Sequence, residues 1–115
     1  MEYKTCCFFG SRPNKLPWGY EEKGIRYFFF RQKLKKTVIG AIGNGYIHFI
    51  SGMALGIDTI AAEIVLELKA KYSKITLECA IPCINQTEKW SEESIMRYQN
   101  ICAQADKLTL VSDTW

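Results

Sequence analysis

The stretch that decides the fold of this chain is Phe49-Ile50-Ser51-Gly52-Met53-Ala54-Leu55-Gly56-Ile57-Asp58, which runs directly into Thr59-Ile60-Ala61-Ala62-Glu63. An apolar strand ends in a loop with two glycines, and the loop opens an amphipathic helix. Apolar residues recur at helical spacing from Ile57 to Leu68, which is the clearest periodicity in the chain. Backbone N–H groups at the start of a helix lie at the positive end of its dipole, where a phosphate or carboxylate binds well. The stretch therefore predicts a strand–helix unit with an anion site.

The same alternation continues on both sides of this loop. The patterns predict strands at 4–9, 46–50, 75–81 and 107–111, and helices at 20–42, from 57 to about 72, and from Ser91, as N-cap, to about 105. Strands that alternate with helices are typical of a parallel sheet with right-handed crossovers. We therefore expect a Rossmann-like, three-layer α/β/α fold whose mainly parallel sheet has about four strands and is covered on both faces.

The composition is that of one ordinary globular domain. The chain has 115 residues, of which 48% are hydrophobic and 23% are charged, so we expect a single domain over 1–115. The net charge of +3 permits an anionic ligand but does not indicate a long nucleic-acid footprint. The start of the chain lacks the features of a signal peptide, and no apolar run approaches the ~20 residues that span a bilayer. These features predict a cytoplasmic protein without membrane association.

The cysteines do not follow a metal-binding pattern. No Cys-x-x-Cys pair is present, and the chain has a single histidine, so we expect no metal ion and no cofactor. Buried, reduced thiols are the favoured interpretation, with a metal or redox role as the alternative. The five cysteines are Cys6, Cys7, Cys79, Cys83 and Cys102.

The loop at 51–58 carries the first group of candidate ligand-binding residues. Gly52 and Gly56 allow close approach of backbone to a ligand and positive φ angles. Ser51 could donate its hydroxyl to a phosphate, and Asp58 could accept from a ribose hydroxyl or cap free N–H groups. The alternative is a tight turn with Asp58 as a first-turn acid. Met53 and Ala54 complete the predicted site, whose glycine spacing matches neither the dinucleotide motif nor the P-loop.

A second loop is expected at the same edge of the sheet, because it follows the first predicted strand. Its candidate ligand-binding residues are Gly10, Ser11, Arg12 and Pro13. Arg12 offers planar, bidentate recognition of a phosphate or carboxylate. The alternative is an ordinary surface arginine.

A third loop follows the third predicted strand and carries Asn85, Gln86 and Trp90. Asn85 and Gln86 could hydrogen-bond to the edge of a base, and Trp90 could stack on it. Trp90 could equally pack the loop onto the helix that begins near Ser91.

The remaining polar candidates give no catalytic constellation. We interpret His48 as a histidine of the core, Glu63 as part of a solvated helix face, and the aromatic run 27–30 as core or interface. No nucleophile–base pair or paired carboxylates stand out, so we assign no catalytic residue.

Three motifs in the same order give the chain a resemblance to a known family. They are Cys7–Gly19 with its Gly-Ser-Arg-Pro core, Phe49–Asp58 with Ala61-Ala62-Glu63, and Ala80-Ile81-Pro82 with Asn85-Gln86 and Lys89-Trp90. Together they resemble the YpsA-like branch of the SLOG superfamily, which joins the DNA-processing protein A (DprA/Smf) family to the LOG nucleotide hydrolases. Members of this branch continue through further strands and a Gly-Gly-Thr loop that the chain lacks. We therefore expect a domain that is short at its C-terminal end.

The resemblance implies a nucleotide or nucleotide-derived ligand at the strand ends. A binding or sensor module is our leading hypothesis. The alternatives are single-stranded DNA binding, as in the DNA-processing relatives, and a protein-interaction module or homo-oligomer built on an incompletely covered sheet. Nucleotide hydrolysis follows only by analogy, since the hydrolase signature Pro-Gly-Gly-x-Gly-Thr is missing.

Overall fold

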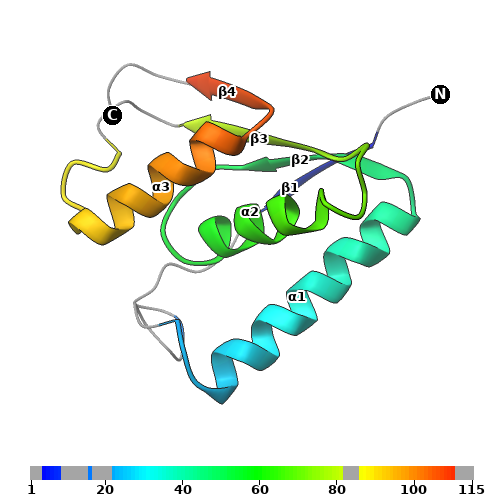
Figure 1. Ribbon diagram of the computed structural model, residues 1–115, viewed down its shortest axis with the longest axis horizontal. Helices are drawn as coiled ribbons and strands as arrows, with labels where there is room; N and C mark the ends of the chain where they lie inside the picture. The colour runs from blue at the N-terminus through cyan, green and yellow to red at the C-terminus, as the bar shows by residue number, and fades with distance from the viewer. Residues whose placement is uncertain (1–3, 9–15, 17–21, 82–85, 111–115) are drawn as a thin grey trace.

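Strands and helices alternate along the chain as the sequence predicts (Figure 1). The computed structural model describes residues 4–8, 16, 22–81 and 86–110. The elements are β1 (Lys4–Phe8), α1 (Ile25–Gly43), β2 (Tyr46–Ser51), α2 (Ile57–Leu68), β3 (Thr76–Ile81), α3 (Glu92–Gln104) and β4 (Lys107–Leu110).

Two helices are shorter than their sequence patterns suggest. Helix α1 begins at Ile25 rather than at Tyr20, and Gly24 before it has a φ of 92°, which is outside the helical region. Helix α2 ends at Leu68 instead of continuing to about Tyr72. The chain turns there because Ile75 must enter the core, where it is 1% exposed.

The four strands form one parallel sheet in the order β1-β2-β3-β4. This confirms the predicted Rossmann-like α/β class. The register places Phe8 beside Ser51, and Ser51 beside Cys79, so β1, β2 and β3 reach the same edge of the sheet together. A loop that follows β2 therefore lies next to the ends of β1 and β3.

The described helices all lie in one layer, whereas the three-layer arrangement would place helices on both faces (Figure 1). The reason is the strand order. When each strand is added to the same side of its predecessor, right-handed crossovers put every helix on the same face. Contacts between neighbouring helices hold this layer together: Arg31 of α1 binds Glu67 of α2, and Glu63 of α2 binds Arg97 of α3.

The core lies between this layer and the sheet. Phe49 of β2 is fully buried, and Phe8 of β1 stacks on it with ring centroids 5.9 Å apart. Burying an aliphatic or aromatic side chain of this size contributes about 1.5–3 kcal/mol. The helices and β3 supply most of the rest of the core: Val38, Ile60, Ile64, Val65, Leu68, Leu77, Cys79 and Ile101.

Glu63 is not part of a solvated face, which corrects the sequence-based interpretation. Arg97 Nε donates to Glu63 Oε2 over 2.9 Å, and Arg97 Nη1 donates to Glu22 Oε2 over 2.8 Å. Burial of Arg97 opposes its charged form, but the hydrogen bonds to the two carboxylates outweigh this and raise the pKa of Arg97. The pattern of α2 alone could not reveal this pair, because Arg97 is 34 residues away in the chain.

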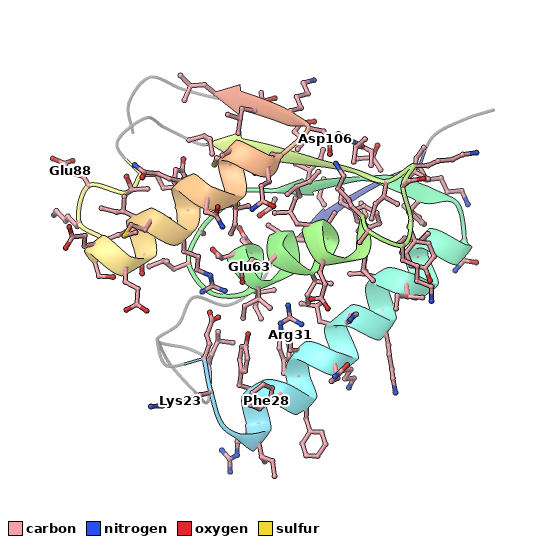
Figure 2. The ribbon with its side chains drawn as sticks, viewed as in Figure 1. Lys23, Phe28, Arg31, Glu63, Glu88 and Asp106 are labelled. Carbon is pink, nitrogen blue, oxygen red and sulfur yellow. The ribbon has the colours of Figure 1, made fainter. Side chains whose placement is uncertain are left out.

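The aromatic run at the start of α1 divides between the core and the surface. Tyr27 is buried, whereas Phe28 and Phe29 are 59% and 70% exposed. In Figure 2, Phe28 lies at the outer end of α1, while Arg31 reaches from α1 toward α2. Among the residues described, no helix has the length and apolar character required to cross a membrane.

The N-cap of α3 tests the predicted start of that helix. The Ser91 hydroxyl accepts a hydrogen bond from the Ser94 N–H at 3.1 Å, as the sequence predicts. We expect Ser91→Ala to lower the free energy of unfolding by about 1 kcal/mol, because it leaves an N–H of the first turn without this acceptor. Urea unfolding followed by circular dichroism measures the change. Ser73→Ala, at an exposed position outside the helices, is the matched control, and equal effects in both variants would contradict the capping role.

Candidate functional site

The loop between β2 and α2 has a backbone conformation that favours glycine at position 56. Gly56 is the N-cap of α2 and has φ 95° and ψ −132°, a region that L residues rarely adopt. Met53, in the same loop, has a φ of 59° and is fully buried. The loop thus holds two unusual backbone conformations within four residues, and such conformations cluster at ligand sites.

The Ser51 hydroxyl holds this loop in shape. It accepts a hydrogen bond from the Met53 N–H at 3.1 Å and donates to the backbone carbonyl of Asp58 at 2.9 Å. Thr59 adds a second brace by donating its hydroxyl to the carbonyl of Ala54 at 2.7 Å. The donation from Ser51 to a phosphate, which the sequence suggested, would require the hydroxyl to leave Asp58. In this structure the role of Ser51 is to position the loop.

The first turn of α2 faces this loop with its positive end. No side chain caps the helix, and Asp58 is the acidic residue of the first turn. A carboxylate there interacts favourably with the helix dipole. A Cβ placed on Gly52 would lie 3.2 Å from Asp58 Oδ2, so the absence of a side chain at Gly52 gives the carboxylate its room. The first turn of α2 therefore presents backbone N–H donors together with one carboxylate acceptor, that of Asp58.

Gln86 connects the third predicted loop to this one. Its Nε2 donates to the backbone carbonyl of Gly52 at 3.3 Å, although the two residues are 34 positions apart. Its Oε1 is buried and has no hydrogen-bond partner among the residues that the structure describes, which is unusual for a buried amide oxygen. The structure thus brings Gln86 to Gly52, in the loop that also carries Met53, Ala54 and Gly56.

Trp90 lies on the helix side of the third loop. Its ring meets the ring of Tyr98 of α3 edge to face, with centroids 5.5 Å apart. This contact agrees with the packing interpretation of Trp90, in which the ring fixes the loop on α3.

Five of the predicted ligand-binding residues lie outside the described residues: Gly10, Ser11, Arg12, Pro13 and Asn85. The described residues show where the strands that precede these two segments end. Strand β1 ends at Phe8 beside Ser51, and β3 ends at Ile81, whose neighbouring residues in the sheet lie on β4.

The sheet face without described helices carries a polar network that the sequence interpretation missed. His48 is 26% exposed in its side chain and does not lie in the core, which corrects the expectation. Its Nε2 contacts Glu78 Oε1 at 2.8 Å and its Nδ1 contacts Thr76 Oγ1 at 2.6 Å. Thr109 donates to Glu78 Oε2 at 2.7 Å. The alternation of His48 with the buried Phe49 was the signal for this placement.

These hydrogen bonds act on Glu78. Donation from Thr109 and from His48 favours the charged carboxylate and lowers the pKa of Glu78, although its burial acts in the opposite direction. The described residues contain no group of three or more His, Cys, Asp or Glu side chains that could hold a metal ion.

A concavity lies among the three helices, away from the loop after β2. Its volume is 430 Å³, and it is bordered by Tyr27, Arg31, Glu63, Leu66, Glu67, Asn100, Ile101 and Gln104. Arg31 and Lys35 both bind Glu67, at 2.8 and 2.7 Å, so opposite charges are already paired along this groove.

A parallel sheet with a glycine-containing loop at its carboxyl edge, opening a helix, is typical of a Rossmann-like α/β domain. The comparisons with known proteins narrow this class. The sequence model of the YspA SLOG family matches residues 6–115, and the chain belongs to this family. The predicted YpsA-like resemblance is thus confirmed.

Curated relatives agree with this assignment. A UPF0398 protein of Brevibacillus brevis is 35% identical over 95 residues, which are 83% of this chain and 50% of the relative. A UPF0398 protein of Macrococcus caseolyticus is 33% identical over 109 residues, 92% of this chain and 57% of the relative. The chain therefore spans about half the length of the curated relatives it matches.

The backbone of Gly56 gives a stability prediction. We expect Gly56→Ala to lower the free energy of unfolding by about 1–3 kcal/mol, because alanine is strained at this φ and ψ. Gly40→Ala is the matched control. Gly40 lies inside α1 with open space around its missing Cβ, so alanine there should raise stability by about 0.5–1 kcal/mol. Chemical denaturation of both variants measures the pair, and a neutral Gly56→Ala would contradict the strained geometry.

The lowered pKa of Glu78 gives a pH prediction. Because the folded state binds this proton less tightly than the unfolded state, the stabilisation is complete above the ordinary value of 4.5 and is lost as the pH falls below it. We expect Glu78→Gln to reduce the acid-dependent loss of unfolding free energy between about pH 6 and pH 3. Glu88→Gln, at an exposed position, is the control. Identical pH profiles for wild type and Glu78→Gln would contradict the role of the network.

Proposed function

We propose that this domain binds a nucleotide or nucleotide-derived ligand at the carboxyl edge of its parallel sheet, as a binding or sensor module. The observation that carries the proposal is the start of α2. The helix has no side-chain cap, it begins at a glycine with a φ of 95°, and it follows directly on a central strand. Such a helix start is a favourable place for a phosphate.

The chemistry of the surrounding groups supports a nucleotide over a bare phosphate. Asp58 supplies a carboxylate in the first turn of α2, where it can accept a hydrogen bond from a ribose hydroxyl. The unpaired Oε1 of Gln86 is an acceptor that a base amine could satisfy. The backbone N–H groups at the start of α2 can donate to a phosphate, and Asp58 and Gln86 can accept from a ribose hydroxyl and a base amine. Together these groups match the donors and acceptors of a nucleotide.

Arg12 completes the proposal from the sequence. It follows β1, which ends beside Ser51 at the same sheet edge. A guanidinium in this region would neutralise the phosphate charge that Asp58 opposes. Membership of the YspA SLOG family is consistent with this assignment. We further propose a cytoplasmic location and a nucleotide-type small molecule as partner.

Calorimetric titration with a panel of nucleoside mono-, di- and triphosphates tests the proposal. We expect at least one ligand to bind, and Arg12→Ala to weaken it by about 10- to 100-fold, since a charge-assisted hydrogen bond contributes about 1.5–3 kcal/mol. Arg26→Ala, which removes the same charge from an exposed position in α1, should leave the affinity unchanged. If no nucleotide produces heat, or if both arginine variants lose affinity equally, the proposed site is wrong.

A single-stranded oligodeoxynucleotide in the same panel tests the main alternative, which is binding of single-stranded DNA. DNA binding as in the DNA-processing relatives would show a steep loss of affinity with salt, because several phosphates would release counterions. A mononucleotide held at one helix start should show a shallow salt dependence. Steep dependence with no mononucleotide binding would replace the present proposal with DNA binding.

A further inference from the structure

The outer face of α1 begins with a cluster of three exposed apolar side chains. Ile25, Phe28 and Phe29 are 72%, 59% and 70% exposed. They are spaced three and four residues apart, which places them together on one side of the first turns of the helix. Figure 2 shows Phe28 at the outer end of α1. Single exposed apolar residues are common on protein surfaces, whereas a cluster of large ones marks an interaction surface.

The same helix carries basic residues and no acidic ones. Its sequence, Ile25–Gly43, contains Arg and Lys but neither Asp nor Glu. The basic residues that face α2 are paired with Glu67. Arg26, Lys33 and Lys36 are exposed and form no ion pair with any residue that the structure describes. The outer face of α1 is therefore positively charged as well as apolar.

The apolar and the basic residues share this outer face. Lys33 and Lys36 lie four and seven residues after Phe29, and these spacings return to the same side of a helix. Arg26 lies one turn before Phe29 on a neighbouring stripe. The outer face thus begins with apolar side chains at the end of the helix and continues with lysines along its length.

The charge of this face favours one class of partner. A second copy of the chain would bring another positive helix against it, and like charges repel. An anionic lipid surface has the opposite charge, and its headgroup boundary accepts aromatic and aliphatic side chains. A fluid bilayer can also adapt to side chains that project from a convex helix, whereas a protein partner would have to supply a matching groove.

We propose that the outer face of α1 is a peripheral docking surface for an anionic lipid bilayer. Ile25, Phe28 and Phe29 enter the headgroup boundary, and Lys33 and Lys36 contact lipid phosphates. The helix lies on the bilayer and does not cross it. The sequence-based expectation of no membrane association rested on the lack of a spanning apolar run and did not consider such a surface contact. The proposal is independent of nucleotide binding, since it uses neither α2 nor the loop after β2.

Vesicle flotation of the full chain tests the proposal. We expect the protein to float with vesicles of equal parts phosphatidylglycerol and phosphatidylcholine, and to stay behind with vesicles of phosphatidylcholine alone. High salt should reduce the binding, because it screens the contacts between lysines and lipid phosphates. Absence of binding to the anionic vesicles, or equal binding to both kinds, would overturn the proposal.

An exposed apolar variant tests the contribution of the aromatic cluster. Phe29→Ala should weaken binding to the anionic vesicles by about tenfold, because it removes a ring from the headgroup boundary. Met96→Ala is the matched control, since Met96 is an apolar side chain of α3 that is 66% exposed. It should leave the affinity unchanged, and equal losses in the two variants would contradict docking through α1.

A pair of lysine variants tests the charge. The double variant Lys33→Gln/Lys36→Gln should weaken binding by about 10- to 30-fold, because each lysine near an anionic surface contributes about 1 kcal/mol. Lys71→Gln/Lys74→Gln, at exposed positions after α2, removes the same charge elsewhere and should have a much smaller effect. Equal losses would show attraction by net charge alone and would overturn the assignment to α1.

Light scattering without lipid tests the competing partner, a second copy of the chain. We expect a monomer. A dimer that Phe29→Ala dissociates, together with no vesicle binding, would assign the outer face of α1 to self-association instead. Circular dichroism checks that each variant folds, and the comparison of the two vesicle types with the wild-type chain decides the proposal if a variant does not.

Discussion

The bracing of the loop after β2 by the Ser51 hydroxyl is the interaction on which the candidate site depends. One oxygen atom binds the Met53 N–H and the carbonyl of Asp58, so it fixes the loop to the first turn of α2. Ser51 is fully buried, and an unpaired hydroxyl at this place would be costly. The loop can therefore keep the positive φ values of Met53 and Gly56 and can leave the start of α2 without a side-chain cap.

The one-sided helical layer explains where charges gather in this domain. Because consecutive crossovers place α1, α2 and α3 on one face, α2 has a neighbour on each side. Glu67 pairs with α1 and Glu63 pairs with α3, so the layer is joined by ion pairs as well as by apolar contacts. On the other sheet face, Glu78 is satisfied by His48 and Thr109 without help from any described helix. Parallel sheets usually have both faces covered.

Strand β3 contributes both to the neighbourhood of the loop after β2 and to the core under the helices. Its register with β2 sets Cys79 beside Ser51, and the chain that follows it brings Gln86 to Gly52. On the helix side of the same strand, Cys79 belongs to the core cluster against which Cys102 of α3 packs. The chain spans about half the length of the curated relatives it matches.

The sequence by itself determined the order of strands and helices, the glycine loop at 51–58 and the N-cap at Ser91, because these follow from local periodicity and from short-range backbone preferences. It also carried the family resemblance, since three motifs in fixed order need no coordinates. Only the tertiary structure decided the roles of His48 and Glu63 and the hydrogen bond from Gln86 to Gly52. Each of these contacts joins residues at least 28 positions apart, and such pairings depend on strand order and register, which the periodicity of one segment does not contain.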